Sequence, residues 1–214
     1  MDGTLVDSYE GIFHAYQWTM KQMGRDFGGE NFVRRAIGAP LIWVFENICG
    51  MGHTQAEQAA SHYRAYYADK GKHEATVYSG MEKTLNRLKK AGCFIGVATL
   101  KKESFAKEIL EEQGLLSYFD VVCGMDGGDS LTKADLIRRC MRAAKSKKEE
   151  TVLIGDSEFD AAGAEEAGVA FLGVTYGFGF RDRRHLNEYG VVMGAETAGE
   201  IADLLCAEQK GTKR

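Results

Sequence analysis

The feature that most constrains the fold of this chain is a change of rhythm at about residue 78. Beyond it, short apolar runs alternate with amphipathic helical segments. The runs cover 93–98, 119–123, 151–155 and 169–174, with a weaker one at 191–193. Runs that are apolar throughout indicate strands buried on both faces, and the helices between them indicate right-handed crossovers. The sequence therefore predicts an α/β fold with a doubly wound parallel sheet.

Before residue 78 the apolar residues follow helical periodicity, and no strand is predicted there. Ile12, Tyr16, Met20 and Met23 share one helix face. A second helix is predicted after Pro40 and a third over 54–70, with glycine breaks at 28–29 and 50–52. Aromatic residues of this region are expected to lie mainly in the core, namely Phe13, Tyr16, Trp18, Trp43 and Phe45.

Composition excludes several classes of protein. The net charge is −4 and 44% of the residues are hydrophobic, which argues against disorder and against a nucleic-acid polymer as partner. No apolar run approaches the roughly 18 residues of a membrane span, so no membrane partner is expected. The five cysteines are scattered and include no CxxC pair, which favours reduced thiols in a cytoplasmic protein.

Polar residues that suit phosphate chemistry follow the predicted strands, where ligands bind in such folds. The run at 151–155 leads into Asp156 and Asp160, two carboxylates that can serve Mg²⁺. Helix capping by Asp156 or Ser157 is the alternative. Thr99 follows the run at 93–98, where its hydroxyl suits a phosphate oxygen or caps a helix. Lys133 lies just inside a helix start, where it can offset phosphate charge or simply be solvated.

These pieces occur in a specific order along the chain. Asp-Gly-Thr-Leu-Val-Asp-Ser at 2–8 comes first, then Thr99, Lys133 and Gly-Asp-x-x-x-Asp at 155–160. This order resembles the haloacid dehalogenase superfamily of phosphatases over nearly the whole chain. The resemblance is to the branch of phosphoglycolate phosphatases and 5′-nucleotidases with a helical cap. It implies a Rossmann-like core formed by 1–8 and 78–214, and a cap formed by 9–77 in which 37–41 is the best candidate for touching substrate.

The resemblance also implies a Mg²⁺-dependent reaction through a phosphoaspartyl intermediate. Asp2 would be the acid/base, and its backbone carbonyl would ligate Mg²⁺. Thr99 would bind the phosphoryl oxygens, and Lys133 would offset their charge. Asp156 would ligate the metal directly, and Asp160 would support the metal site without ligating the metal. The implied phosphate-binding residues are Gly3, Thr99, Leu100 and Lys133, and the implied metal-site residues are Asp2, Asp156 and Asp160.

One departure from the family pattern affects catalysis. The family motif is Asp-x-Asp-Gly-Thr, and its first Asp is the nucleophile. Met1 stands at the x position, so the nucleophile and the apolar strand that leads to it would precede Met1. The first core strand is therefore expected to be truncated, with unpaired ladder groups on its two neighbours and reduced stability. A start set too late at an internal Met is favoured over a genuine remnant.

Three functions remain open at this stage. The leading one is a phosphomonoesterase acting on a small phosphorylated metabolite, either phosphoglycolate or a nucleoside 5′-monophosphate. The others are a non-catalytic phosphate-binding remnant and a phosphotransferase similar to phosphoglucomutases. Dehalogenation fits less well, because in the family these motifs form a Mg²⁺–phosphate arrangement.

Overall fold

A computed structural model describes residues 1–126 and 130–207. Its parallel strands confirm the predicted α/β fold. They are β3 (Gly96–Lys102), β4 (Val121–Met125), β5 (Val152–Gly155), β6 (Ala170–Val174) and β7 (Met193–Ala195). β3 pairs with β4, and separately β5, β6 and β7 form a three-stranded sheet in that order. Within the described residues, β3 and β5 are not paired with each other, so the sheet is in two parts.

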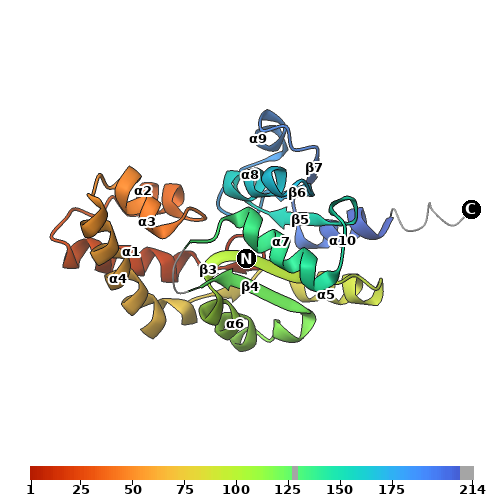
Figure 1. Cartoon of the computed structure of the whole chain (residues 1–214), viewed down its shortest axis with the longest axis horizontal. Coiled ribbons are helices and arrows are strands. Elements are labelled where there is room, and N and C mark those ends of the chain that lie inside the picture. Colours follow the sequence, from red (N-terminus) through yellow and green to blue (C-terminus); the bar gives the residue numbers. More distant parts are fainter. Residues whose placement is uncertain (127–129, 208–214) are drawn as a thin grey trace, which may run out of the picture.

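Helices connect and cover these strands, as the alternating pattern predicted (Figure 1). They are α5 (Met81–Lys90), α6 (Glu103–Glu112), α7 (Lys133–Ala144), α8 (Glu158–Ala167), α9 (Arg183–Glu188) and α10 (Ala198–Ala207). Short 3₁₀ turns lie at Leu116–Tyr118 (η3) and Lys148–Glu150 (η4). α7 packs against α8 and also contacts β3 and β4, whereas α5 packs against α10.

Residues 9–73 form a unit that contains helices only, seen at the left of Figure 1. Its elements are α1 (Tyr9–Gln22), α2 (Gly29–Ala36), α3 (Leu41–Trp43), a π-helical turn η1 (Val44–Ile48), α4 (His53–Asp69) and a 3₁₀ turn η2 (Gly71–His73). The chain enters through β1 (Val6–Asp7) and leaves through β2 (Thr76–Val77), which pair antiparallel. All of residues 15–70 are described and none of them is in a strand.

Three local predictions need correction. β3 starts later than the predicted run at 93–98 and continues through Thr99 to Lys102, with an irregular register after Ala98. Thr99 therefore lies within a strand and does not follow one. The weak run at 191–193 is similarly displaced, because β7 begins at Met193.

The expected burial of the aromatic residues is correct for only some of them. Tyr16 and Phe45 are buried. Trp18 and Trp43 were expected in the core and are instead 41% and 42% exposed. Trp18 packs against Tyr66 within the helical unit, while Trp43 reaches Phe159 of α8 with ring centroids 6.0 Å apart. Trp43 thus lies at the junction between the helical unit and the rest of the molecule.

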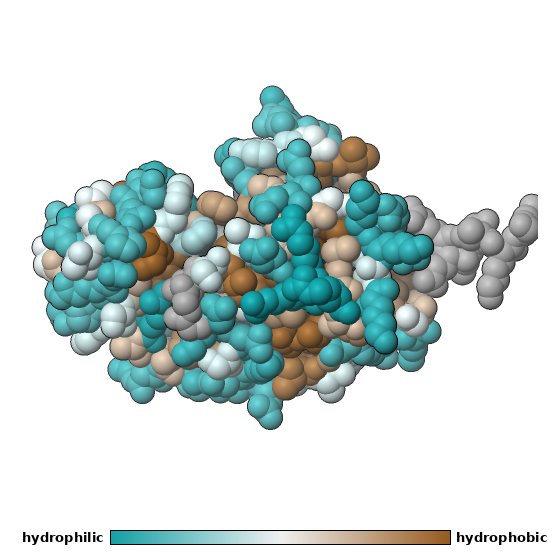
Figure 2. All heavy atoms as spheres, in the orientation of Figure 1, coloured by the Kyte–Doolittle hydropathy of each residue, from teal (hydrophilic) through white to brown (hydrophobic). Residues whose placement is uncertain are grey.

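The surface agrees with the mixed composition. Figure 2 shows a mainly hydrophilic face, with hydrophobic residues emerging where the helical unit meets the rest of the chain and beside α7. All five cysteines are free thiols. Within the described part of the chain, no helix is long and apolar enough to cross a bilayer.

Candidate active site

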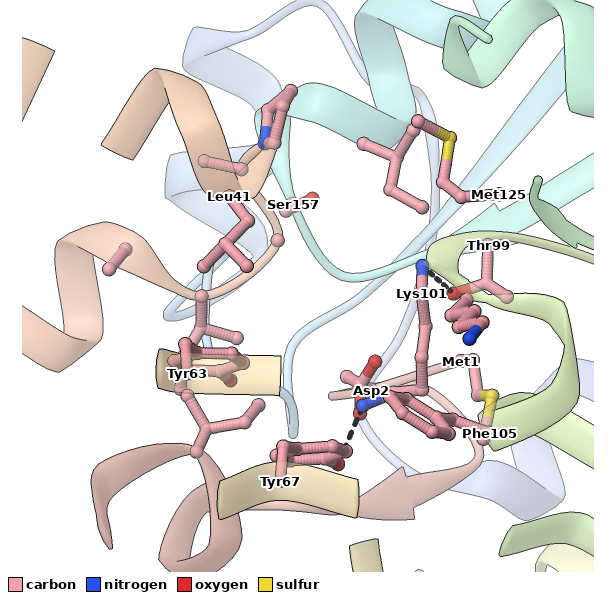
Figure 3. Close-up of a pocket in the computed structure, with 18 of the residues that line it drawn as sticks. Met1, Asp2, Leu41, Tyr63, Tyr67, Thr99, Lys101, Phe105, Met125 and Ser157 are labelled. Atoms are coloured by element: carbon pink, nitrogen blue, oxygen red, sulfur yellow. Dashed lines mark hydrogen bonds and ion pairs between the residues drawn. The ribbon is translucent and has the colours of Figure 1, made fainter. Parts of the chain in front are cut away.

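A cavity of about 190 Å³ lies where β3 and β5 meet the helical unit (Figure 3). The predicted site residues that line it come from four separate segments and are Asp2, Thr99, Leu100, Lys133, Asp156 and Asp160. Gly3 does not line the cavity itself but lies directly behind the Asp156 carboxylate. The structure therefore brings all seven predicted residues to one place.

The turn after Asp2 holds Asp156 in position. Gly3 has a φ of +69°, and a methyl group on it would lie 2.1 Å from the nearer Asp156 carboxylate oxygen. No side chain fits that space, so glycine is required both for the backbone angle and for the close approach. Thr4 completes the contact, since its hydroxyl donates to Oδ1 of Asp156 at 3.0 Å. The Phe178 amide donates to Oδ2 at 2.9 Å.

Asp160 is occupied on both of its carboxylate oxygens. Oδ2 accepts the Ser157 hydroxyl at 2.8 Å and the backbone amides of Asp156 and Ser157, forming the capping box at the start of α8. Oδ1 pairs with the Lys133 ammonium at 2.6 Å. Lys133 also donates to the Ala98 carbonyl at 3.1 Å. The sequence leaves helix capping and a place in the metal site as alternatives for this segment, and Asp160 combines a capping role with a place in the cavity.

The two buried carboxylates have opposite pKa shifts. Burial and the neighbouring Asp160 carboxylate raise the pKa of Asp156 to about 6. Burial alone would also raise the pKa of Asp160, but the Lys133 ammonium, the N-terminal ammonium and the Ser157 hydroxyl together outweigh burial and hold that pKa below its ordinary value. Asp160 is therefore the anion that keeps Lys133 in place, while Asp156 has no side-chain cation paired with it among the described residues.

Asp2 has a cationic partner that the sequence analysis missed. The Lys101 ammonium lies 3.3 Å from Oδ1 of Asp2, and the Ser8 hydroxyl donates to the same oxygen at 2.5 Å. Lys101 also donates to the Tyr67 hydroxyl at 2.6 Å. Burial raises the pKa of the Asp2 carboxyl, but Lys101 and its other neighbours outweigh this and hold it below the usual value. Strand alternation was the available signal, because residues two apart share a face and Lys101 follows Thr99.

The donor set fits Mg²⁺, which the family resemblance implies. Within the described residues each oxygen of Asp156 accepts a single hydrogen bond and keeps a lone pair, whereas Oδ2 of Asp160 accepts three and its Oδ1 is paired with Lys133. Among the residues described, no three His, Cys, Asp or Glu side chains are grouped to hold a metal alone. Mg²⁺ usually takes one or two carboxylates and completes its shell with waters and phosphate oxygens. Asp156 and Asp2 fit that pattern, and Asp160 fits a supporting place behind them.

The helical unit supplies the opposite wall of the cavity. Ile37, Gly38, Ala39, Pro40 and Leu41 all line it, so the predicted segment 37–41 does reach the site. Tyr63 and Tyr67 of α4 also line the cavity, and Figure 3 shows Tyr67 beside Asp2 and Lys101. No motif indicated these tyrosines, because their position depends on how α4 packs within the helical unit, chiefly against α1.

Comparison with known proteins agrees with this geometry. A family model described as haloacid dehalogenase-like hydrolase matches residues 1–174. This chain belongs to that family. The 5′-nucleotidase of Pseudomonas aeruginosa is 33% identical over 183 residues, covering 85% of this chain and 83% of that protein. A phosphoglycolate phosphatase of Pseudomonas syringae is 32% identical over 190 residues, covering 83% of this chain and 68% of that protein.

The haloacid dehalogenase-like fold is also found in solved structures. The crystal structure of a predicted phosphatase from Clostridium acetobutylicum superposes with a TM-score of 0.91 at 33% identity. The match covers 97% of this chain and 95% of that one. By family, then, this chain is a hydrolase of phosphatase type with an α/β fold.

Proposed function

We propose that this haloacid dehalogenase-like hydrolase is a Mg²⁺-dependent phosphomonoesterase acting on a small phosphorylated metabolite. One observation carries the proposal: Asp2, Thr99, Lys133 and Asp156 line a single cavity beside the ends of β3 and β5. That cavity offers a hydroxyl, a cation and carboxylates from separate elements. Such a set can hold a phosphoryl group and the metal that accompanies it.

Each residue has a distinct task in this proposal. Thr99 is 4% exposed, and its hydroxyl is available to a phosphoryl oxygen at the cavity wall. Lys133, fixed by Asp160, lowers the energy of negative charge gathering on that group. Asp2 protonates the leaving alkoxide and then takes a proton from the attacking water. Bound Mg²⁺ would orient the phosphoryl group and offset its charge, with Asp156 and the Asp2 carbonyl as its protein ligands.

The nucleophile is the part of this arrangement that only the family motif locates. In the family motif a carboxylate two residues before the acid/base attacks phosphorus, and in this chain that position would directly precede Met1. Asp2 is a poor substitute, because one carboxyl cannot both attack phosphorus and protonate the leaving group. We therefore propose that the nucleophile of this reaction is an Asp directly before Met1, at the end of an apolar strand.

The helical unit serves as the cap in this proposal, over residues 9–77, with the core formed by 1–8 and 78–214. The β1–β2 ribbon supplies two adjacent linkers between them. Cap movement about these linkers would admit substrate and then exclude water. The segment 37–41 and the two tyrosines of α4 face the reacting groups when the cap is closed.

Among the candidate substrates, the cavity lining favours a nucleoside 5′-monophosphate. Aromatic and apolar side chains line much of the cavity, among them Tyr16, Leu41, Tyr63 and Phe105. An apolar wall with aromatic rings suits the flat, weakly polar body of a nucleobase. Phosphoglycolate, whose leaving group carries a carboxylate, would leave most of that wall uncontacted.

Hydrolysis by an extended chain tests the proposal. The extension adds Val-Ile-Val-Phe-Asp directly before Met1, and the matched control ends in Asn. We expect Mg²⁺-dependent release of phosphate by the Asp form, with nucleoside 5′-monophosphates preferred over phosphoglycolate. The Asn form and the unextended chain should be slower by several powers of ten. Equal Mg²⁺-dependent rates for all three proteins would disprove the nucleophile assignment, and inactivity of all three would favour a non-catalytic remnant.

A further inference from the structure

Three tyrosines of the helical unit form a row of adjacent rings along the active-site cavity. They are Tyr16 of α1 and Tyr63 and Tyr67 of α4, and all three line the cavity. The ring centroids of Tyr16 and Tyr63 are 4.7 Å apart, and those of Tyr63 and Tyr67 are 5.7 Å apart with nearly parallel planes. We call this set the tyrosine row. Tyr16 and Tyr67 are only 3% and 2% exposed, so packing holds the row in place before any ligand binds.

The hydroxyl groups of the tyrosine row have hydrogen-bonding capacity that the protein does not use. The Lys101 ammonium can only donate, so the Tyr67 hydroxyl accepts from it at 2.6 Å, and the phenol's own hydrogen has no acceptor among the described residues. The hydroxyls of Tyr16 and Tyr63 make no hydrogen bond within the described part of the chain. They are not enclosed either, because among the described residues only the Tyr9 hydroxyl is a fully buried side-chain polar atom without a partner.

Burial keeps these three groups in the form that can donate a hydrogen bond. It raises the pKa of Tyr16, Tyr63 and Tyr67 above the ordinary value of 10. Each phenol therefore carries its hydrogen at physiological pH and can both donate and accept. Polar groups in the interior of a protein are normally paired, so three unused hydroxyls around one cavity indicate a ligand that brings the partners.

The tyrosine row begins beside the groups proposed to react. The Lys101 ammonium that bonds the Tyr67 hydroxyl also lies 3.3 Å from Oδ1 of Asp2, the proposed acid/base. The acid/base protonates the bridging oxygen, so the part of the substrate that meets the row is the leaving group, close to its attachment to phosphate. A leaving group that carries hydroxyl groups there would satisfy both the rings and their hydroxyls. An apolar leaving group would contact the rings and leave the hydroxyls unpaired.

We propose that the tyrosine row determines substrate specificity by binding hydroxyl groups of the leaving group, and that it recognises the 2′,3′-diol of ribonucleoside 5′-monophosphates. The proposal rests on the proposed function, which supplies the phosphate site. Ribose carries two neighbouring hydroxyls on the sugar that is joined directly to the phosphate, and each of them can donate and accept. A deoxy analogue would leave phenol hydroxyls without partners, so the row that binds a ribonucleotide also discriminates against the analogue.

Calorimetry with adenosine 5′-monophosphate (AMP) and its 2′,3′-dideoxy analogue in the presence of Mg²⁺ tests the recognition without turnover. Both the unextended chain and the Asn form are measured, so the comparison does not depend on the stability of either. We expect AMP to bind at least about tenfold more tightly, the scale of two neutral hydrogen bonds. Tyr63→Phe keeps the ring and should weaken AMP binding about three- to tenfold while leaving the affinity for the analogue unchanged.

Tyr66→Phe is the matched control, because Tyr66 lies on the same helix and is not among the residues that line the cavity. It should change neither affinity. Equal affinities of the unsubstituted protein for the two nucleotides, or a Tyr63→Phe loss that is the same for both, would overturn the proposal. Absence of binding by either nucleotide would overturn it as well.

Kinetics of the extended Asp form separate this proposal from the proposed function. We expect kcat/KM to be at least about tenfold higher for AMP than for the dideoxy analogue, again from two neutral hydrogen bonds. Equal hydrolysis of both nucleotides would contradict only the role of the tyrosine row. If neither is hydrolysed while calorimetry still shows the Tyr63-dependent preference for AMP, only the proposed function is wrong. Faster hydrolysis of ribose 5-phosphate than of AMP would overturn the assigned substrate class.

Discussion

At the scale of single residues, the site is built from charges that are buried in pairs. Lys133 is paired with Asp160 and Lys101 with Asp2, and all four side chains are at most 17% exposed. Removing one member of such a pair leaves the other charge buried and uncompensated, which costs more than the pair itself contributes. Lys101 is the more informative of the two lysines, because it joins the acid/base to Tyr67 of the helical unit.

We expect Lys101→Met to lower kcat of the extended chain by about 10²- to 10³-fold, the usual scale for loss of a positioned charge at the reacting group. The proposed acid/base would lose the cation that orients it and that offsets the negative charge left on Asp2 once its proton has passed to the leaving alkoxide. Lys107→Met is the matched control, because Lys107 pairs with Glu103 on the surface of α6. Steady-state kinetics of both variants decide the matter. A kcat unchanged by Lys101→Met would remove Lys101 from the catalytic apparatus.

Asp156 gives a second prediction at this scale, in the pH dependence of Mg²⁺ binding. Because burial raises the pKa of Asp156 to about 6, the carboxylate that ligates the metal is mostly protonated at pH 5. We expect the Mg²⁺ affinity measured by calorimetry to fall by about tenfold between pH 7 and pH 5, and Asp156→Asn to abolish both the binding and its pH dependence. An affinity that is the same at both values of pH would contradict the assignment.

The same shift has a defined sign for stability in the absence of metal. The pKa of Asp156 is above its ordinary value of 3.8, so the folded chain binds this proton more tightly than the unfolded chain. The contribution of Asp156 to the free energy of unfolding is complete below pH 3.8 and is lost as the pH rises through about 6. Asp156→Asn should remove this part of the pH profile.

At the scale of elements, the turn formed by residues 1–6 supports the Asp156 side of the active site. The Met1 carbonyl accepts the Leu5 amide at 2.8 Å, and the Gly3 amide donates to the Val6 carbonyl at 3.0 Å. This tight turn brings Gly3 against Asp156 from the far end of the sequence. A short motif therefore fixes a contact between residues more than 150 positions apart.

We expect Gly3→Ala to lower the free energy of unfolding by more than about 2 kcal/mol, because it adds a clash with Asp156 to an unfavourable backbone angle. Gly24→Ala separates the two effects. Gly24 has a similar φ of +63° but nothing within 4 Å of the added methyl group. Its cost should be about 1 kcal/mol, from the backbone angle alone. Urea denaturation measures both, and equal losses would mean that the close approach to Asp156 is not rigid.

The elements also show what sequence reasoning can and cannot reach. Asp2, Lys133 and Asp156 were predictable, because each belongs to a motif at a turn, a helix start or a strand end whose local geometry is fixed by nearby residues. Thr99 was correctly predicted as a site residue, although it lies within β3 and not after its end. Lys101 could have been predicted as a site residue, because residues two apart on a strand share a face and Lys101 lies two residues after Thr99. Tyr63 and Tyr67 were not predictable, since their approach to the site depends on the tertiary packing of α4 against α1, which no local pattern encodes. The extent of β3 was missed because its last residues are polar.

At the scale of the whole molecule, the helical unit and the α/β part of the chain meet at one cavity. The helical unit touches the rest of the molecule near the site through Tyr67 with Lys101, and through Trp43 with Phe159. The first contact involves a proposed catalytic pair. The second is an aromatic contact outside the reacting groups, so it can be changed without altering the chemistry itself.

Trp43 therefore tests whether the helical unit closes over substrate. In the extended chain we expect Trp43→Ala to raise KM by about two- to tenfold, which is the value of one aromatic pair, while kcat changes little. The reason is that the ring contact with α8 stabilises the closed arrangement in which substrate is held. Trp18→Ala is the control, because Trp18 is exposed to the same degree, lies in the same unit and contacts only Tyr66 among the ring pairs of the described residues. If both variants raise KM equally, the effect comes from loosening of the helical unit, and the contact between Trp43 and Phe159 has no part in closure.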